Sequence, residues 1–128
     1  MSQIQTFSPA GTTTLGPYSP AVACGNMVYT SGQIPRTAAG VVVGDSIEAA
    51  TQQALENLRS VLASAGCTPQ DVVKTTVFMQ DLSDFEGMNK TYAKFFGEHR
   101  PARSTVQVAK LPASARVEIE CIAVKRQS

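Results

Sequence analysis

Two stretches of the chain carry apolar residues at the three- and four-residue steps that mark one face of a helix. The first stripe consists of Ile47, Ala50, Ala54, Leu58, Val61, Leu62 and Ala65, and the second of Phe85, Met88, Tyr92 and Phe95. Asp45 or Ser46 can cap the first helix and Gly66 can end it. Ser83 and Glu86 have the spacing of a capping box at the start of the second. The pattern therefore predicts two amphipathic helices.

Strand-like segments surround these helices. Short runs of β-branched, aromatic or alternating residues predict strands at 21–24, 27–30, 72–79, 102–108 and 116–124, and residues 41–43 are a candidate for one more. The dipeptide Gly25-Asn26 predicts a tight hairpin between the first two. The first 20 residues are rich in Thr, Gly, Pro and Ser, and we expect an extended arm and loop there.

The last two strands alternate between two faces of a sheet. In the final strand one face holds Val117, Ile119, Cys121 and Ala123, and the other holds Arg116, Glu118 and Glu120. In the strand before it, Arg103, Thr105 and Gln107 alternate with Ser104, Val106 and Val108. We expect both helices to cover the apolar face, and Arg103 and Glu118 to share the uncovered one. The prediction is an α+β domain with a mainly antiparallel or mixed sheet.

The uncovered face turns apolar towards one end, where Ile122 and Val124 follow Glu118 and Glu120. Such a face can meet water, as it does in many antiparallel sheets, or it can meet the same face of further copies of the chain. The apolar end favours self-association.

Length, charge and composition narrow the class of protein. The 128 residues suffice for one hydrophobic core, so residues 1–128 are predicted to form a single domain. The 11 Lys and Arg are scattered and nearly balanced by 10 Asp and Glu, which gives no basic patch for nucleic acid. No leader is visible, and no apolar run approaches the roughly 20 residues that span a bilayer. We therefore expect a cytoplasmic protein without a membrane partner.

Several kinds of site are unsupported. Cys24, Cys67 and Cys121 lie far apart without a C-x-x-C pair, which argues against a disulfide framework and a zinc site and predicts buried or inert thiols. His99 is the sole histidine, and we interpret it as a surface loop residue. The chain lacks G-x-S-x-G, G-x-G-x-x-G and Walker A motifs. A zinc or multi-histidine metal site and a nucleotide cofactor are therefore not expected.

Arg103 and Glu118 are the remaining pair with chemical potential. A guanidinium can hold a carboxylate through two parallel hydrogen bonds, and a nearby glutamate can orient or deprotonate a water. Together they suit a small carboxylic acid attacked by water. The same pair could instead form a cross-strand salt bridge, and the pattern by itself favours that interpretation.

Six blocks of sequence, in order over nearly the whole chain, resemble the reactive intermediate deaminase family, also called the YjgF family. They are Gly16-Pro-Tyr18, residues 26–35 with Thr-Ser-Gly-Gln-Ile-Pro, residues 73–85, Asn89-Lys-Thr-Tyr92, Pro101-Ala-Arg-Ser104 and Val117-Glu-Ile-Glu120. The resemblance implies a chorismate-mutase-like α+β fold and a homotrimer. Its sheets would form a central barrel, with active sites between neighbouring subunits.

The resemblance also implies an activity. Members of the best-known subgroup hydrolyse reactive 2-imino acids such as 2-iminobutanoate and 2-iminopropanoate to 2-oxo acids and ammonia, without a metal or an organic cofactor. The imines are products of pyridoxal-phosphate-dependent dehydratases, which gives a functional link to those enzymes. Two other interpretations stay open: an endoribonuclease or translation inhibitor, and a non-catalytic small-ligand or chaperone-like binding protein.

Carried over residue by residue, the resemblance assigns roles to several positions. Arg103 would bind the substrate carboxylate, helped by the main chain at Gly32, and Glu118 would position the attacking water. The remaining positions that would line the pocket are Tyr18, Asn89 and Ser31. Thr105 stands where many relatives carry a cysteine, and the loop 97–101 is shorter than in many members. Thiol-dependent behaviour is therefore not expected, and substrate preference is left open.

Overall fold

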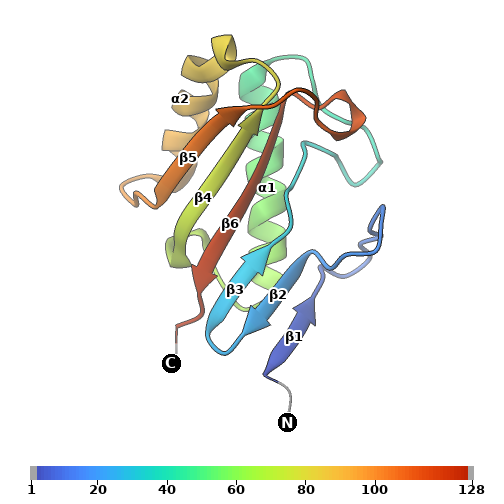
Figure 1. Ribbon diagram of the computed structural model, residues 1–128, viewed down its shortest axis with the longest axis vertical. Helices are drawn as coiled ribbons and strands as arrows, with labels where there is room; N and C mark the ends of the chain where they lie inside the picture. Colours follow the sequence, from blue (N-terminus) through green and yellow to red (C-terminus); the bar gives the residue numbers. More distant parts are fainter. Residues whose placement is uncertain (1–2, 127–128) are drawn as a thin grey trace.

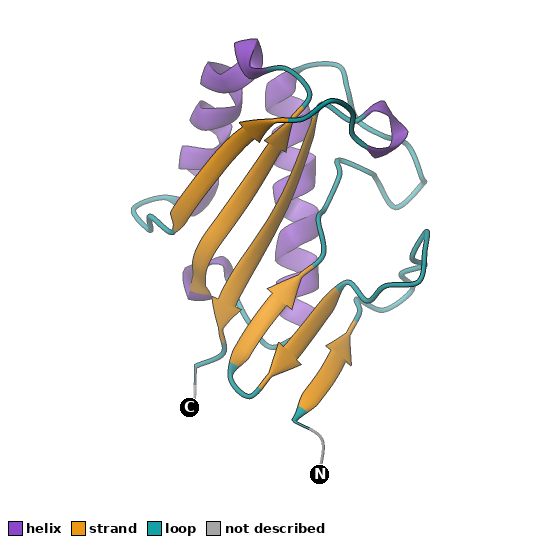
Figure 2. Cartoon of the chain, in the orientation of Figure 1, coloured by secondary structure: helices purple, strands orange, loops and turns teal. Residues whose placement is uncertain are grey.

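The computed structural model describes residues 3–126 and shows one mixed sheet with both helices on the same face (Figures 1 and 2). The strands run in the order β1-β2-β3-β6-β4-β5, and every neighbouring pair is antiparallel except β4 and β5. Their bounds are β1 Ile4–Phe7, β2 Ala21–Cys24, β3 Met27–Thr30, β4 Val72–Met79, β5 Ala102–Gln107 and β6 Val117–Val124. The predicted α+β architecture is confirmed.

Both predicted helices form, α1 over Ile47–Ser64 and α2 over Phe85–Phe96. Ser46 caps α1, because its side chain accepts a hydrogen bond from the Ala49 amide at 3.0 Å. Gly66 follows α1 with a φ of +80°, as a glycine after a helix end often does. The predicted Ser83 capping box is wrong. A 3₁₀ turn at Leu82–Asp84 precedes α2 and is capped by Asp81, whose carboxylate accepts from the Ser83 amide.

Two predictions for the irregular segments are also wrong. Within the N-terminal arm, β1 pairs with β2 along four residues, although its side chains are mostly exposed. A strand at a sheet edge buries little, so its sequence lacks the apolar signal of a core strand. Residues 41–43 do not form a strand, and Val42 makes a single bridge to Arg36. Residues 1 and 2 of the arm lie outside the described part of the chain.

The core lies between the sheet and the helices. It contains the predicted apolar side of β6, with Val117, Ile119, Cys121 and Ala123 all buried against the α1 stripe. Burial raises the pKa of the Cys121 thiol to about 12, so this thiol stays protonated and unreactive at neutral pH. Cys67 is buried as well, whereas Cys24 is exposed on β2, so two of the three thiols are buried as expected.

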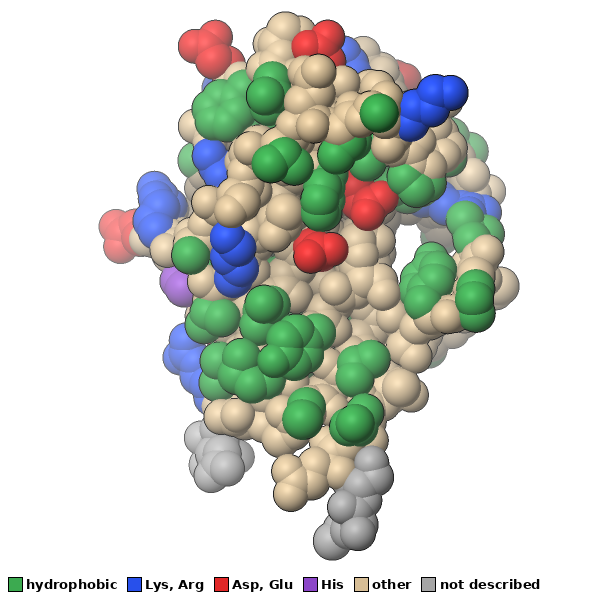
Figure 3. Space-filling model, in the orientation of Figure 1, with side chains coloured by type: hydrophobic (Ala, Val, Ile, Leu, Met, Phe, Trp, Pro, Cys, Tyr) green, Lys and Arg blue, Asp and Glu red, His purple; other side chains and the backbone are tan. Residues whose placement is uncertain are grey.

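The sheet face away from the helices is partly apolar. In the register of the strands, Tyr29 lies opposite Ile122 and Phe78 opposite Glu118, and Tyr29 is 45% exposed. Val106 of β5 is 41% exposed. Figure 3 looks onto this face and shows apolar side chains on either side of acidic ones. The predicted charged face is therefore a mixed face. Within residues 3–126, no helix has the length and apolar character needed to cross a membrane.

Candidate functional site

Arg103 and Glu118 lie on opposite faces of the sheet, so their predicted placement on one face is wrong. Arg103 is in register with Thr75 of β4, and Thr75 is in register with Cys121, whose side chain is buried under the helices. Glu118 alternates with these buried residues of β6 and faces the other way. The sequence interpretation failed because β5 is an edge strand in which the apolar Val106 points away from the helices.

The guanidinium of Arg103 is packed against α2. Its Cζ lies 4.7 Å from the ring centroid of Tyr92 and 5.6 Å from that of Phe85. None of the ion pairs among residues 3–126 involves Arg103 or Glu118. The cross-strand salt bridge is therefore absent, and the guanidinium keeps its hydrogen-bond donors available for an anion.

Asn89 belongs to the same side of the molecule as Arg103. It is exposed on α2, four residues after Phe85, and the two residues line a small surface hollow. We call Phe85, Asn89, Tyr92 and Arg103 the Arg103 group. Phe85 and Tyr92 were predicted only as part of an apolar helix stripe. The seven-residue spacing that joins them was visible in the sequence, but the guanidinium beside them was not.

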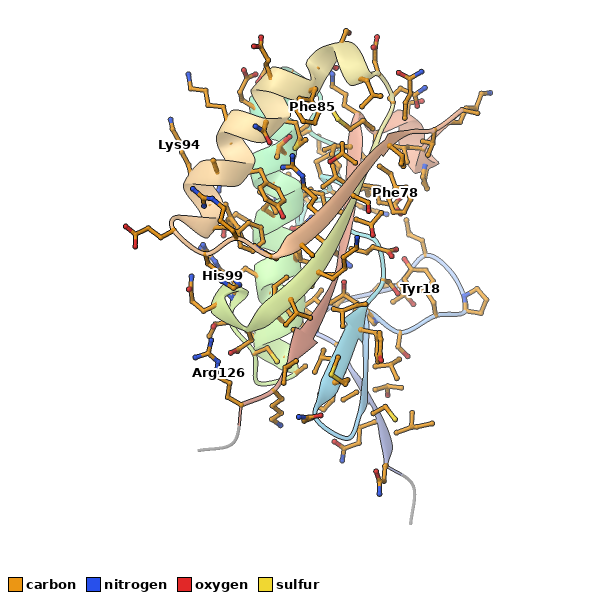
Figure 4. The ribbon with its side chains drawn as sticks, turned by 60° about the vertical axis from the view of Figure 1, so that its left-hand side comes forward. Tyr18, Phe78, Phe85, Lys94, His99 and Arg126 are labelled. Atoms are coloured by element: carbon orange, nitrogen blue, oxygen red, sulfur yellow. The ribbon has the colours of Figure 1, made fainter. Side chains whose placement is uncertain are left out.

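The other predicted site residues line a cleft of about 780 Å³ beside the N-terminal arm. Tyr18, Ser31, Gly32 and Glu118 all contribute to its wall, and we call them the Glu118 group. Figure 4 shows Phe85 on α2, with Tyr18 and Phe78 on the far side of the sheet. Arg36, which the sequence did not single out, is the other charged residue among those that line the cleft.

Backbone hydrogen bonds fix the loop that carries Ser31 and Gly32. The amide of Gln33 donates to the Ile119 carbonyl at 2.8 Å, and the Ile119 amide donates back at 3.0 Å. The Ser31 hydroxyl donates to the Ser19 carbonyl at 2.7 Å, so it braces the loop. These bonds hold Gly32 directly against Glu118. A Cβ on Gly32 would fall 2.7 Å from Glu118 Cδ, closer than real Cβ contacts allow.

Glu118 has an altered acidity. Burial raises the pKa of its carboxyl group, and the neighbouring Glu120 carboxylate raises it further. The carboxyl is thus easier to protonate than that of an ordinary glutamate. A carboxylate with a raised pKa accepts a proton from water more readily, which suits a group that orients or deprotonates an attacking water.

His99 lies in a loop, as expected, but it also has a structural contact. It is half-buried, and its Nε2 is hydrogen-bonded to the Val72 carbonyl at 2.7 Å. This bond joins the loop after α2 to the start of β4. His99 does not line the cleft, so the Glu118 group has no imidazole within it.

Comparison with known proteins identifies the family. The family model described as Endoribonuclease L-PSP matches residues 10–125. The chain is 48% identical over 115 residues to the 2-iminobutanoate/2-iminopropanoate deaminase of Salmonella typhimurium, covering 88% of this chain and 90% of that protein. It is 45% identical over 112 residues to a RutC family protein of Pyrococcus horikoshii, covering 87% and 89%.

A solved structure agrees with these sequence relatives. The crystal structure of Escherichia coli TdcF with bound serine superposes with a TM-score of 0.89 at 39% identity, covering 95% of this chain and 99% of that one. The sequence blocks, the fold and the matches all point the same way. The chain belongs to the Endoribonuclease L-PSP family, the reactive intermediate deaminase or YjgF family that its motifs resemble.

Proposed function

We propose that the protein hydrolyses reactive 2-imino acids, such as 2-iminobutanoate and 2-iminopropanoate, to 2-oxo acids and ammonia, in a site that two copies of the chain complete. The deaminase relatives at 47–48% identity support the reaction. The main support for a shared site is that Arg103 and Glu118 face opposite sides of one sheet, and neither has an ion-pair partner among residues 3–126. One chain alone cannot bring them together across its own strands.

Assembly of copies follows from the mixed sheet face. Its exposed apolar side chains, Tyr29 and Val106 among them, resemble an interface more than a solvated surface. We infer a homotrimer whose sheets face one another as a central barrel, as in the chorismate-mutase-like arrangement. In such a ring the Arg103 group of one copy would meet the Glu118 group of the next.

The reaction needs positioning more than strong acid or base. Arg103 of one copy would hold the substrate carboxylate through its planar fork, assisted by the Gly32 main chain of the neighbouring copy. Glu118 would orient a water towards the imine carbon and accept its proton. A C–O bond forms as the C=N π bond opens, and the proton that Glu118 took from the water passes to the nitrogen. The hydroxyl of this intermediate then gives up its proton to the nitrogen, and the oxygen forms the C=O bond as the C–N bond breaks, which gives the 2-oxo acid and ammonia.

The biological setting is part of the proposal. Such imines are released by pyridoxal-phosphate-dependent dehydratases, and we place the protein in the cytoplasm beside them. Two rival functions are endoribonuclease or translation-inhibitor activity and non-catalytic binding in the same cleft. Cleavage of RNA through its 2′-hydroxyl usually uses a general acid and a general base near a cationic site. The cleft offers Glu118 and Arg36 without a histidine, which favours the imine.

Glu118→Gln should separate hydrolysis from binding. Hydrolysis of 2-iminobutanoate, generated by a threonine dehydratase and followed as 2-oxobutanoate, should fall by about 10-fold, because the amide can hold a water but cannot take its proton. Binding of 2-oxobutanoate should persist. In wild type the rate should fall as pH drops through the raised pKa of Glu118, and the variant should lose this dependence.

Two further readouts decide between the rival functions. A raised pKa in the folded protein means that ionised Glu118 costs stability as pH rises through that pKa, so the variant should melt no lower than wild type at neutral pH. Equal hydrolysis rates for wild type and Glu118→Gln would favour simple binding. Cleavage of a single-stranded RNA by wild type, lost in the variant, would favour the endoribonuclease.

Tyr29→Glu should break the assembly. Tyr29 lies in the middle of the mixed face, where a carboxylate would have to be desolvated against another copy. Light scattering should show a trimer for wild type and smaller species for the variant. Val41→Glu is the matched control, because Val41 is 61% exposed in a loop outside this sheet. A wild-type monomer at micromolar concentration would contradict the shared site.

A further inference from the structure

Two aromatic rings flank the guanidinium of Arg103. Phe85 and Tyr92 are seven residues apart on α2, so they share one face of the helix and are separated by about 10.5 Å along its axis. Arg103 Cζ lies 5.6 Å from the first ring centroid and 4.7 Å from the second. The guanidinium is therefore within cation–π distance of both rings.

The ring of Tyr92 is held in place from behind. Its hydroxyl shares a 2.7 Å hydrogen bond with the hydroxyl of Thr75, and both side chains are buried. Thr75 is also the residue of β4 in register with Arg103. The same strand position thus fixes the ring and the backbone of the arginine that packs on it. The ring of Phe96, 4.8 Å away, supports Tyr92 from the core.

Phe85 closes the other side and faces solvent. It is 36% exposed at the start of α2, so one side of its ring is not covered by the rest of the chain. Asn89 lies between Phe85 and Tyr92 along the helix, on the exposed side of the same stripe. Two aromatic rings therefore contact the guanidinium, one buried and one partly exposed.

We propose that Phe85 and Tyr92 are positioning residues that bracket Arg103 and leave only the edge of its guanidinium open, so that the site selects a planar carboxylate bound in that plane. This inference rests on the proposed function of Arg103. A guanidinium is attracted to aromatic faces, and the attraction grows when water is excluded. We call Phe85 and Tyr92 around Arg103 the bracket. Because the bracket already restricts the rotamers of Arg103, less side-chain entropy is lost when a substrate binds.

Tyr92→Leu tests the bracket. The Kd for 2-oxobutanoate and the KM for the imine should each rise by about 10-fold, because a desolvated cation–π contact is lost and the guanidinium becomes mobile. The kcat should change by less than about 3-fold, since Arg103 holds the carboxylate equally in the ground and transition states. Tyr92→Phe keeps the ring and should stay within about 3-fold of wild type in Kd.

A matched control exists on the same helix. The Cζ of Arg59 lies 4.7 Å from the ring centroid of Phe95. Phe95→Leu therefore removes a cation–π contact of the same kind that does not involve Arg103. It should leave the Kd for 2-oxobutanoate unchanged. If Tyr92→Leu and Phe95→Leu weaken binding equally, or if neither does, the bracket is refuted as a device of the site.

A measurement independent of activity tests the geometry itself. The Nε–H proton of Arg103, assigned in NMR spectra by its loss in Arg103→Lys, should be shifted upfield by the ring currents of its two neighbours. The shift should shrink in Tyr92→Leu and in Phe85→Leu and stay in Phe95→Leu. An unshifted proton in wild type overturns the bracket. If instead Arg103→Ala binds 2-oxobutanoate as tightly as wild type does, the proposed function fails. The Nε–H shift in the wild-type protein still tests the bracket in that case.

Discussion

Arg103→Ala should reduce kcat/KM for imine hydrolysis by about 100- to 1,000-fold, the loss expected when one partner of a buried charge-assisted pair is removed. The other groups that we assign to the site, Glu118 and the Gly32 main chain, cannot neutralise a substrate carboxylate. Binding of 2-oxobutanoate, measured by calorimetry, should be lost as well. The fold should persist, because Arg103 makes no ion pair with the described residues.

Arg103→Lys tests whether the positive charge suffices without the planar geometry of the guanidinium. A lysine keeps the positive charge but presents a single rotating ammonium in place of a planar fork. We expect kcat/KM to recover to within about 10-fold of wild type, since a point charge still attracts the carboxylate. Full activity in Arg103→Ala would place the carboxylate elsewhere, with Arg36 of the cleft as the next candidate.

Mixing two impaired variants tests whether the site is shared. Arg103→Ala retains a complete Glu118 group, and Glu118→Gln retains a complete Arg103 group. After the two are unfolded together and refolded as an equal mixture, about a quarter of the sites should pair two intact halves in a closed ring. Activity should therefore rise above that of either variant alone. A mixture no better than its components would mean that each chain builds its own site.

The helices and strands were predictable where the pattern of apolar residues within one segment determines which side is buried. The apolar stripe of α1 and the alternation of β6 each place one side in the core, so their positions follow from periodicity alone. β1 was missed because an exposed edge strand needs no apolar face. The Ser83 capping box was wrong because the Asp81 carboxylate competes for the same backbone and starts a 3₁₀ turn first.

The candidate site residues could be proposed from the sequence as a set, but their arrangement could not be predicted. Alternation fixes that Arg103 and Thr105 share a side of β5, but it does not say which side. That choice depends on α2, whose rings accept the arginine, and on an open face that receives the apolar Val106. Gly32 and Glu118 are in contact although they are far apart in the sequence. The hydrophobic pattern of one sequence does not predict such contacts.

The contact between Gly32 and Glu118 gives the second large effect. Gly32 does not have a positive φ, so an alanine fits the backbone without strain. The added methyl would occupy the space of the Glu118 side chain, 2.7 Å from its Cδ. The carboxylate must move, and the Gly32 main chain, which we propose to assist the substrate carboxylate, becomes shielded at the same time. We expect kcat/KM to fall by about 100-fold in Gly32→Ala, more than in Glu118→Gln.

Gly44→Ala separates this effect from a general response to a new methyl group. Gly44 also lacks a positive φ, and a Cβ there meets no atom within 4 Å. Its activity should equal that of wild type, and both variants should melt close to wild type. Because the displaced Glu118 side chain would gain solvent, its pKa in Gly32→Ala should move back towards that of an ordinary glutamate, measurable by carboxyl NMR titration. Activity in Gly32→Ala equal to that in Gly44→Ala would show that the position of Glu118 does not govern hydrolysis.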